Sequence, residues 1–299
     1  MNFTIATTLD EALAAVAAGA RPVAGGSDLV VGARQGKAPL PETVVAIDRI
    51  ESLGNIDASA NGVRIGALVT HARLEFDPAI VDAYTGLADA SALVGSPSTR
   101  NVGTLGGNVM NASPAMDTGA PLVVLDAEVE LQSIAGSRRI AIRDLWTAPG
   151  RTSAQHGELC VAIHLPSRPA MSGSAYVRLE YRRAMEIAVV GAAASVALDA
   201  EGALVSLSIA LTAVAPTIIA VHGTDELAGR PVDASLLAEV AELASAQSAP
   251  ISDLRASDAY RKHCVGVMAR RAVDAAARRA RGESIGVPVN RTLGIGAAS

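Results

Sequence analysis

Thr104-Leu105-Gly106-Gly107-Asn108, followed by Asn111-Ala112-Ser113-Pro114 and then Asp117, is the stretch that decides the fold. Adjacent glycines remove side chains that would keep a ligand away from the backbone, and they permit positive φ, so successive N–H groups can converge on an anion. A second glycine-rich turn, Ala24-Gly25-Gly26-Ser27-Asp28, lies upstream. Each turn is expected to follow an apolar, strand-like run and to precede short polar side chains. Two such turns in one chain predict a cradle for a large phosphorylated cofactor.

Each glycine pair could instead be a structural bend, and an isolated pair would favour that interpretation. The second turn is surrounded by more short hydrogen-bonding side chains than a bend needs, which favours phosphate contact. Asp28 could cap a helix beginning at Leu29, or its carboxylate could accept a hydrogen bond from an adenosine ribose. Asp117 could likewise be a helix N-cap. His71 is interpreted as a structural or solvent-facing histidine, and Tyr181 mainly as part of a solvated or interface cluster.

Three further runs carry a resemblance to a known family: Pro22-Val23-Ala24-Gly25-Gly26-Ser27-Asp28-Leu29, Ile65-Gly66-Ala67-Leu68-Val69-Thr70-His71, and the block from Thr99 to Asp117. They resemble the FAD-binding medium subunit of the molybdenum hydroxylases, a group that includes the carbon monoxide dehydrogenase medium subunit and the flavin domain of xanthine dehydrogenase. The segment from Tyr181 to Val190 is similar to the start of that family's C-terminal domain. The similarity therefore covers the whole chain.

The resemblance implies a set of cofactor-binding residues. The two turns would bind the FAD pyrophosphate from both sides, and Asp117 would contact the ribityl chain or the flavin ring. An aromatic contact from Tyr181 to the isoalloxazine ring is the alternative to its interpretation as a solvated or interface residue. The implied set is Pro22, Val23, Ala24, Gly25, Gly26, Ser27, Asp28 and Leu29 at the first turn, with Thr104, Leu105, Gly106, Gly107, Asn108, Ser113 and Asp117 at the second.

The resemblance also implies the function, that of an oxidoreductase subunit. This chain would take electrons from iron–sulfur clusters of a small subunit, after substrate hydroxylation at a molybdenum cofactor on a large subunit, and pass them to an external acceptor. None of its residues needs to act as a nucleophile or general base. A dimer of heterotrimers is expected. Val94 and Val189 replace an aromatic residue and a lysine of the xanthine dehydrogenase branch, which puts NAD as the acceptor in doubt. The alternatives are a stand-alone FAD-dependent oxidase or reductase with the same domain type, and a non-enzymatic nucleotide-binding module.

Composition argues against several other classes of protein. The net charge of −5 comes from scattered charges and gives no basic stripe, so nucleic acid is not an expected partner. No run reaches the roughly 20 apolar residues of a membrane span, and no secretory signal is visible, so we expect a cytoplasmic location. The 2 cysteines, Cys160 and Cys264, exclude a disulfide framework and a four-cysteine cluster within this chain. The 5 histidines lack metal-ligand spacing, so no protein metal site is expected.

The pattern along the chain predicts an α+β fold. Thr8-Leu9-Asp10-Glu11 fits a capping box that opens a helix ending at Gly19, and Asn61-Gly62 is a tight-turn signal. Strands are expected at 21–24, 44–48 and 63–67, and a helix at 84–94 that Gly95-Ser96-Pro97 breaks. Hairpins are expected at 127–142, turning at Gly136-Ser137, and at 188–214, followed by helices at 234–247 and 257–281.

These elements suggest two domains. Residues 1–170 are expected to form a PCMH-type FAD-binding domain of two small α/β subdomains, about 1–56 and 57–170. Residues 171–299 are expected to form a C-terminal domain of antiparallel sheet plus helices, and the stretch from Pro166 to Ser174 supplies the boundary.

Overall fold

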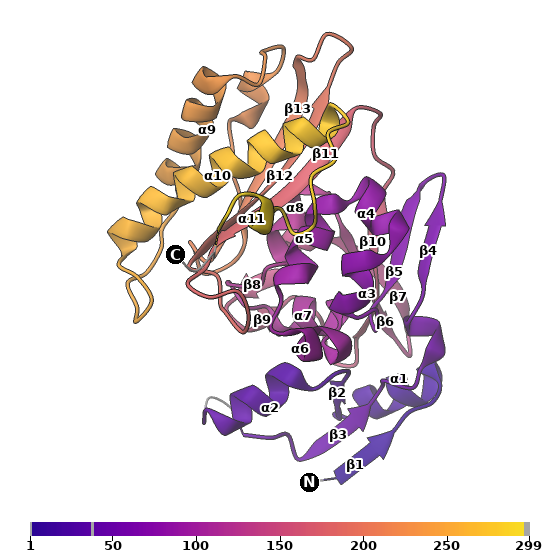
Figure 1. The fold of residues 1–299 in the computed structure, drawn as a ribbon. Coiled ribbons are helices and arrows are strands. Elements are labelled where there is room, and N and C mark those ends of the chain that lie inside the picture. The colour runs from indigo at the N-terminus through magenta and orange to yellow at the C-terminus, as the bar shows by residue number, and fades with distance from the viewer. Residues whose placement is uncertain (1, 37–38, 296–299) are drawn as a thin grey trace.

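The computed structural model describes residues 2–36 and 39–295, and it shows an α+β fold with three main sheets (Figure 1). The N-terminal part contains β1 (Asn2–Ile5), α1 (Leu9–Ala17), β2 (Arg21–Val23), α2 (Ser27–Arg34) and β3 (Thr43–Ala46). Its strands form a parallel sheet in the order β1-β3-β2. The capping box is confirmed, because the Thr8 hydroxyl accepts from the Glu11 N–H and the Glu11 carboxylate accepts from the Thr8 N–H.

The middle part is an antiparallel sheet with helices gathered between it and the C-terminal part (Figure 1). After η1 (Glu51–Leu53), the strands are β4 (Ile56–Ser59), β5 (Gly62–Gly66), β6 (Glu128–Ser133), β7 (Gly136–Ala141) and β10 (Leu159–Pro166), in the order β4-β5-β10-β6-β7. The helices are α3 (His71–Phe76), α4 (Pro78–Ala83), α5 (Thr85–Leu93), α6 (Pro97–Val102), α7 (Leu105–Asn111) and α8 (Gly119–Val124). η2 (Ile142–Asp144), β8 (Trp146–Ala148) and β9 (Arg151–Thr152) complete it.

A tight turn joins β4 and β5, one residue earlier than Asn61-Gly62: Gly62 pairs with Ser59, so the chain reverses at Ala60 and Asn61. The hairpin at 127–142 is confirmed, but its turn is also earlier than the sequence suggested. Gly136 pairs with Ser133 at the start of β7, so the chain reverses at Ile134 and Ala135. Gly136 has a φ of 141°, a value that side-chain-bearing residues rarely adopt, which explains why a glycine opens the second strand.

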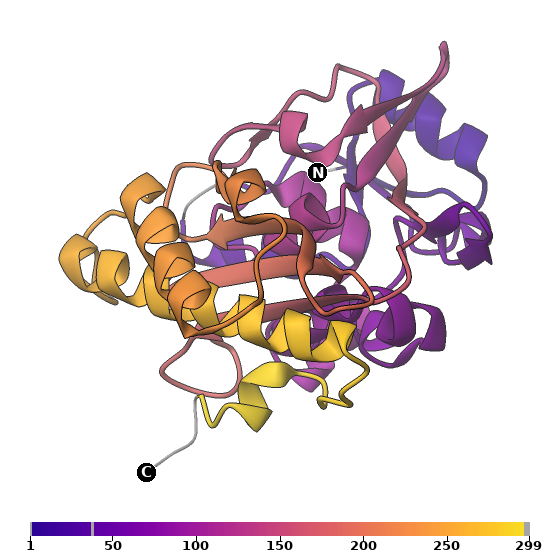
Figure 2. The ribbon, with the colours of Figure 1, turned by 90° about the horizontal axis from the view of Figure 1, so that it is seen from above.

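The C-terminal part consists of an antiparallel sheet, β11 (Ser172–Leu179), β12 (Val190–Leu198), β13 (Leu204–Thr212) and β14 (Ile219–Ala220), followed by helices. These are η3 (Thr224–Leu227), α9 (Ala234–Gln247), α10 (Asp258–Ala280) and α11 (Val289–Thr292). The hairpin and both long helices predicted here are confirmed. In Figure 2, α10 runs across the strands.

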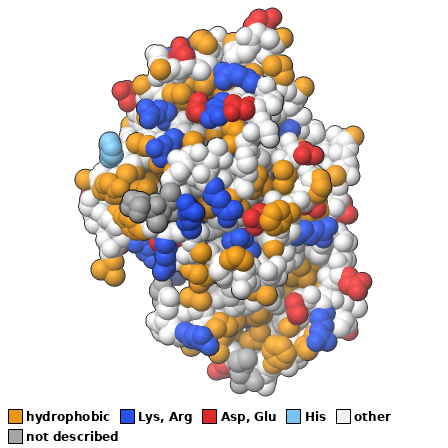
Figure 3. Space-filling view, viewed as in Figure 1, with side chains coloured by type: hydrophobic (Ala, Val, Ile, Leu, Met, Phe, Trp, Pro, Cys, Tyr) orange, Lys and Arg blue, Asp and Glu red, His pale blue; other side chains and the backbone are white. Residues whose placement is uncertain are grey.

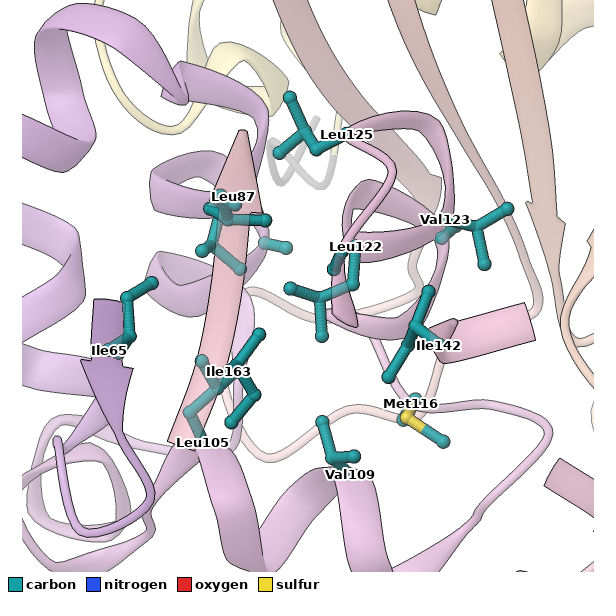
Figure 4. Packing of buried hydrophobic residues seen from close by; sticks show 14 of the residues in the cluster. Ile65, Leu87, Leu105, Val109, Met116, Leu122, Val123, Leu125, Ile142 and Ile163 are labelled. Atoms are coloured by element: carbon teal, nitrogen blue, oxygen red, sulfur yellow. The ribbon is translucent and has the colours of Figure 1, made fainter. Parts of the chain in front are cut away.

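The C-terminal sheet is buried on both faces, because its residues alternate between two cores. Ala175 and Val177 pack with α10, whereas Tyr176 and Ala193 pack with the middle part, whose core is drawn in Figure 4. Leu105, Val109 and Ile163 lie together in that view. The core therefore continues across the boundary predicted from the sequence. Among the described residues, no helix is both long and apolar enough to span a bilayer.

Candidate cofactor site

The first glycine turn follows a strand, as predicted. β2 ends at Val23, and the chain passes through Ala24 and Gly25 to Gly26, the N-cap of α2, which has a φ of 68°. The helix begins at Ser27, so the reading of Asp28 as its cap is wrong; Asp28 lies in the first helical turn. No side chain caps this helix.

The open N-terminus of α2 is suited to an anion. The backbone N–H groups of Ser27, Asp28 and Leu29 have no acceptor among the described residues. Uncapped N–H groups at a helix N-terminus, together with the helix dipole, attract phosphate oxygens. The helix buries none of its residues. Pro22 and Val23, in β2, and Ala24 and Leu29 are half-buried around the turn.

The second glycine stretch differs from the prediction in two ways. It is preceded by α6 and not by a strand, and its glycines lie in the first turn of α7 and not in a loop. Thr104 is the N-cap, and its hydroxyl accepts from the Gly107 N–H at 3.1 Å. The N–H of Leu105 bonds to the Val69 carbonyl and that of Gly106 to the Ala67 carbonyl, while that of Asn108 returns to Thr104. The fold itself therefore uses the N–H groups of these four residues.

The two stretches nevertheless lie side by side. A Cβ added to Gly25 would overlap the carbonyl oxygen of Val102, at the end of α6. A Cβ on Gly106 would lie 2.6 Å from the Cβ of Ala67 in the neighbouring segment. Close packing therefore explains these two glycines. Gly107 meets only its own cap, the Thr104 hydroxyl at 3.0 Å, and Gly26 is required by its positive φ.

His71 lies where the two stretches meet. An added Cβ on Gly103 would lie 3.4 Å from its ring and 3.8 Å from the Ser27 hydroxyl. The side chain is 2% exposed, so the solvent-facing interpretation is wrong. Burial, and secondarily the charge of Arg100, lower the pKa of His71 to about 4, so the ring is neutral. Its Nδ1 has no hydrogen-bond partner among the described residues.

Three of the remaining predicted residues are engaged by the protein. The Asn108 side-chain oxygen accepts from the Thr118 hydroxyl at 2.6 Å, which links α7 to the start of α8. The Ser113 hydroxyl accepts from the Ala115 N–H at 3.3 Å. Leu105 is fully buried in the core, so only its backbone could approach a ligand.

Asp117 is buried, and the N-cap of α8 is Thr118, so the reading of Asp117 as an N-cap is wrong. Its Oδ1 accepts from the Tyr176 hydroxyl at 2.8 Å, and its Oδ2 accepts from Arg178 Nη1 at 2.7 Å. Arg178 also donates from Nε to Glu180 at 2.8 Å. Burial opposes the charge of Arg178, but Asp117, Tyr176 and Glu180 outweigh it and raise the Arg178 pKa. The sequence alone does not single out Tyr176 and Arg178, because a strand pattern does not identify a contact with another part of the chain.

The loop between β11 and β12 lies against the helices of the middle part. The Met185 N–H donates to the Gly95 carbonyl at 2.8 Å, and the exposed Tyr181 donates its hydroxyl to the Arg255 carbonyl at 2.7 Å. A contact from Tyr181 to a flavin stays a prediction. The face in Figure 3 carries basic and acidic side chains interspersed with hydrophobic ones.

The fold is that of a flavin-binding subunit, as comparison with known proteins shows. Residues 1–168 match the model of the FAD binding domain in molybdopterin dehydrogenase, and residues 175–276 match that of the CO dehydrogenase flavoprotein C-terminal domain. The chain belongs to this family, the FAD-binding medium subunits of the molybdenum hydroxylases.

Individual relatives agree with this assignment. The carbon monoxide dehydrogenase medium chain of Afipia carboxidovorans is 35% identical over 88% of this chain and 90% of its own length. The putative xanthine dehydrogenase FAD-binding subunit of Escherichia coli K12 is 32% identical over 80% and 83%. A chain of the reconstituted CO dehydrogenase from Oligotropha carboxidovorans superimposes with a TM-score of 0.88 at 32% identity, covering 93% of this chain and 98% of that one.

The residues present fit FAD. An uncapped helix N-terminus beside the glycines can receive the pyrophosphate. An ionised carboxylate offers about four acceptor positions, and at Asp117 Tyr176 and Arg178 use two, so further hydroxyl groups can bind there. Among the described residues there is no group of three or more His, Cys, Asp or Glu side chains that could hold a metal ion.

Proposed function

We propose that this flavoprotein component relays electrons, taking them from iron–sulfur clusters of a small partner subunit and passing them to an external acceptor. The substrate would be hydroxylated beforehand at a molybdenum cofactor on a large partner subunit. When bound, FAD supplies the exchange between single-electron and paired-electron transfer. This chain's residues would bind and orient the cofactor, with the α2 N–H groups at the pyrophosphate and Asp117 at the ribityl chain or flavin ring.

One observation carries this proposal: an FAD-binding domain is combined with only 2 cysteines, which lie apart. Cys160 is buried in β10 and Cys264 is buried in α10. Burial raises the pKa of Cys160 to about 12, so its thiol stays protonated at neutral pH. An iron–sulfur cluster needs four cysteine ligands as a rule. Electrons from a cluster must therefore come from another chain.

The names of relatives support a multi-chain assembly. One relative is a medium chain of carbon monoxide dehydrogenase, and another is a subunit of the 6-hydroxypseudooxynicotine dehydrogenase complex of Paenarthrobacter nicotinovorans, 31% identical over 94% of this chain. We propose that this chain forms a heterotrimer with the large and small partner subunits, and that two heterotrimers form a dimer in the cytoplasm. We also propose domain limits of 1–170 and 171–299, with subdomains of about 1–56 and 57–170 in the first.

The isolated chain provides the first test. We expect the purified protein to show flavin absorbance, with no iron–sulfur signal in electron paramagnetic resonance and no hydroxylase activity. Substrate oxidation by the chain alone would support a stand-alone oxidase or reductase instead, and a colourless protein that cannot take up FAD would support a non-enzymatic module.

Copurification provides the second test. Tagged protein from its native host should bring down a large subunit that contains molybdenum and a small cysteine-rich subunit. A monomer with full catalytic activity under those conditions would contradict the proposal.

A further inference from the structure

Tyr176 is a fully buried tyrosine of β11 whose hydroxyl reaches across to the middle part of the chain. It donates to Asp117 Oδ1 at 2.8 Å. The neighbouring strand leaves room for this hydroxyl, because a Cβ on Gly191 of β12 would overlap the hydroxyl oxygen. Burial and the charge of Asp117 raise the pKa of Tyr176 well above its ordinary value, so the hydroxyl remains a donor. The packing around Tyr176 therefore holds its hydroxyl in position to donate to Asp117.

The second oxygen of Asp117 is fixed by Arg178, which is 0% exposed. Each oxygen of the carboxylate therefore has one donor from β11, and the two donors together set its orientation. Bonds of this kind, in which one partner is ionised, are the stronger class of hydrogen bond. The orientation of the Asp117 carboxylate is consequently determined by the C-terminal sheet.

Asp117 is also coupled to the second glycine stretch. It immediately precedes Thr118, whose hydroxyl bonds to Asn108 of α7 at 2.6 Å. The carboxylate therefore lies on a segment tied to the helix that carries Gly107. The α2 N–H groups and the Asp117 carboxylate differ in chemistry, because the former can only donate and the latter can only accept. They suit different parts of one ligand, phosphate oxygens and hydroxyl groups respectively.

We propose that Tyr176 is a positioning residue for the cofactor, which holds the Asp117 carboxylate ready to accept hydrogen bonds from the ribityl hydroxyls of FAD. The inference rests on the proposed role of Asp117 and on FAD binding. It assigns the two halves of the ligand to two parts of the protein. The turn at Gly26 binds the pyrophosphate, whereas the C-terminal sheet, through Tyr176, orients the carboxylate that binds the ribityl chain.

The test uses two ligands, FAD and ADP, since ADP retains the pyrophosphate and lacks the ribityl chain. Titration calorimetry on the full chain freed of cofactor should show that Tyr176→Phe weakens FAD binding about tenfold, the effect of losing one hydrogen bond to a charged group. ADP affinity should be unchanged. A matched control is Tyr84→Phe, which removes a buried hydroxyl that bonds to the Pro166 carbonyl at 2.8 Å, away from Asp117. It should change neither affinity.

A structural role for Tyr176 gives a different result. If Tyr176→Phe weakens FAD and ADP equally, or neither, the positioning role is overturned. A double-mutant cycle adds a second criterion: after Asp117→Asn, the Tyr176→Phe change should have no further effect on FAD affinity, and additive losses would overturn the inference. Should Tyr176→Phe fail to fold, Gly191→Ala displaces the same hydroxyl and must give the same pattern for FAD and ADP.

The proposed function fails in a distinguishable way. Gly26→Val should weaken both ligands, because it alters the pyrophosphate end. If the wild-type chain binds FAD with this dependence on Gly26 but without dependence on Tyr176, FAD binding stands and the positioning role falls. If the wild-type chain binds no FAD, both fall.

Discussion

The two glycine stretches look alike in the sequence, but they serve the fold differently. At the first, the N–H groups of Ser27 to Leu29 have no acceptor among the described residues, and α2 buries none of its side chains. At the second, the N–H groups of Leu105 to Asn108 all bond within the protein, and Leu105 is core. A glycine pair can therefore supply free donors in one place and allow close packing in another. Only the surrounding hydrogen bonds separate the two cases.

The largest effect should come from filling the packed position. Gly106→Val places a branched side chain where even a Cβ would lie 2.6 Å from the Cβ of Ala67 and 2.8 Å from its carbonyl oxygen. We expect a loss of about 3 kcal/mol or more in unfolding free energy, as for severe overpacking, measured by denaturant unfolding of the cofactor-free protein. Gly107→Val is the matched control in the same helical turn. Equal destabilisation by the two substitutions would contradict the distinction.

A substitution in the first glycine stretch should instead weaken ligand binding. Gly26→Val forces a branched residue to a φ of 68°, which alters the turn that presents the α2 N–H groups. We expect FAD affinity to fall by about a hundredfold, or roughly 3 kcal/mol, and the purified variant to be colourless while its circular dichroism stays native. Gly107→Val should also be folded and colourless. Retention of stoichiometric FAD by both variants after gel filtration would remove the basis for the residue assignments.

The junction of the two stretches should respond to pH through His71. Its pKa falls from 6.5 to about 4 on folding, so below pH 6.5 the unfolded chain binds a proton that the folded chain does not. Stability from this group is therefore complete above pH 6.5 and is lost as pH falls toward 4. Linkage gives a loss of about 2 kcal/mol between pH 7 and pH 5.

Denaturant unfolding of the wild type and of His71→Gln at both pH values isolates this contribution, because other titrating groups affect both proteins alike. The variant should lose less stability than the wild type over this interval. An identical pH dependence would show that His71 is not responsible.

The smallest effect should come from the cap of α7. Thr104→Val removes the hydroxyl that accepts from Gly107, and loss of an N-cap costs about 1 kcal/mol in unfolding free energy. Because Thr104→Val places no new side chain at Gly107, where a ligand would approach, FAD affinity should change by less than about threefold, a difference under 1 kcal/mol. Calorimetric titration measures it. A hundredfold loss would mean that the orientation of the Gly107 N–H matters directly to the ligand.

Local signals in the sequence predicted much of the fold because their chemistry is contained in a few neighbouring residues. The Thr8 capping box, the presence of a tight turn beside Asn61 and the long amphipathic helices at 234–247 and 258–280 are of this kind. The break predicted at Gly95-Ser96-Pro97 is confirmed, because α5 ends at Leu93. The sequence did not indicate that the same residues also begin a helix: Ser96 is the N-cap of α6 and Pro97 its first residue, a position that proline favours. A helix start and a helix stop can share the same residue types.

The site was less accessible to sequence reasoning for a different reason. The glycines and Asp117 stand out as residue types. Tyr176 and Arg178 do not stand out, because each acts through its contact with Asp117. That residue is separated from them by 59 and 61 positions in the sequence. Such contacts depend on how β11 packs against the middle part, and no local pattern encodes that packing.

Asp89 of α5 has a consequence for how the chain can be divided. Its fully buried carboxylate accepts from Arg279 of α10 at 2.6 and 3.0 Å, from the Val289 N–H at 2.9 Å and from the Tyr176 N–H at 3.2 Å. All of these donors lie beyond residue 170. A fragment that stops there would lack all of these donors, and it would expose the core residues that pack against Tyr176 and Ala193. The flavin-binding half therefore cannot be used as a separate domain. It must be expressed, transferred to another protein and engineered together with the segment that follows it.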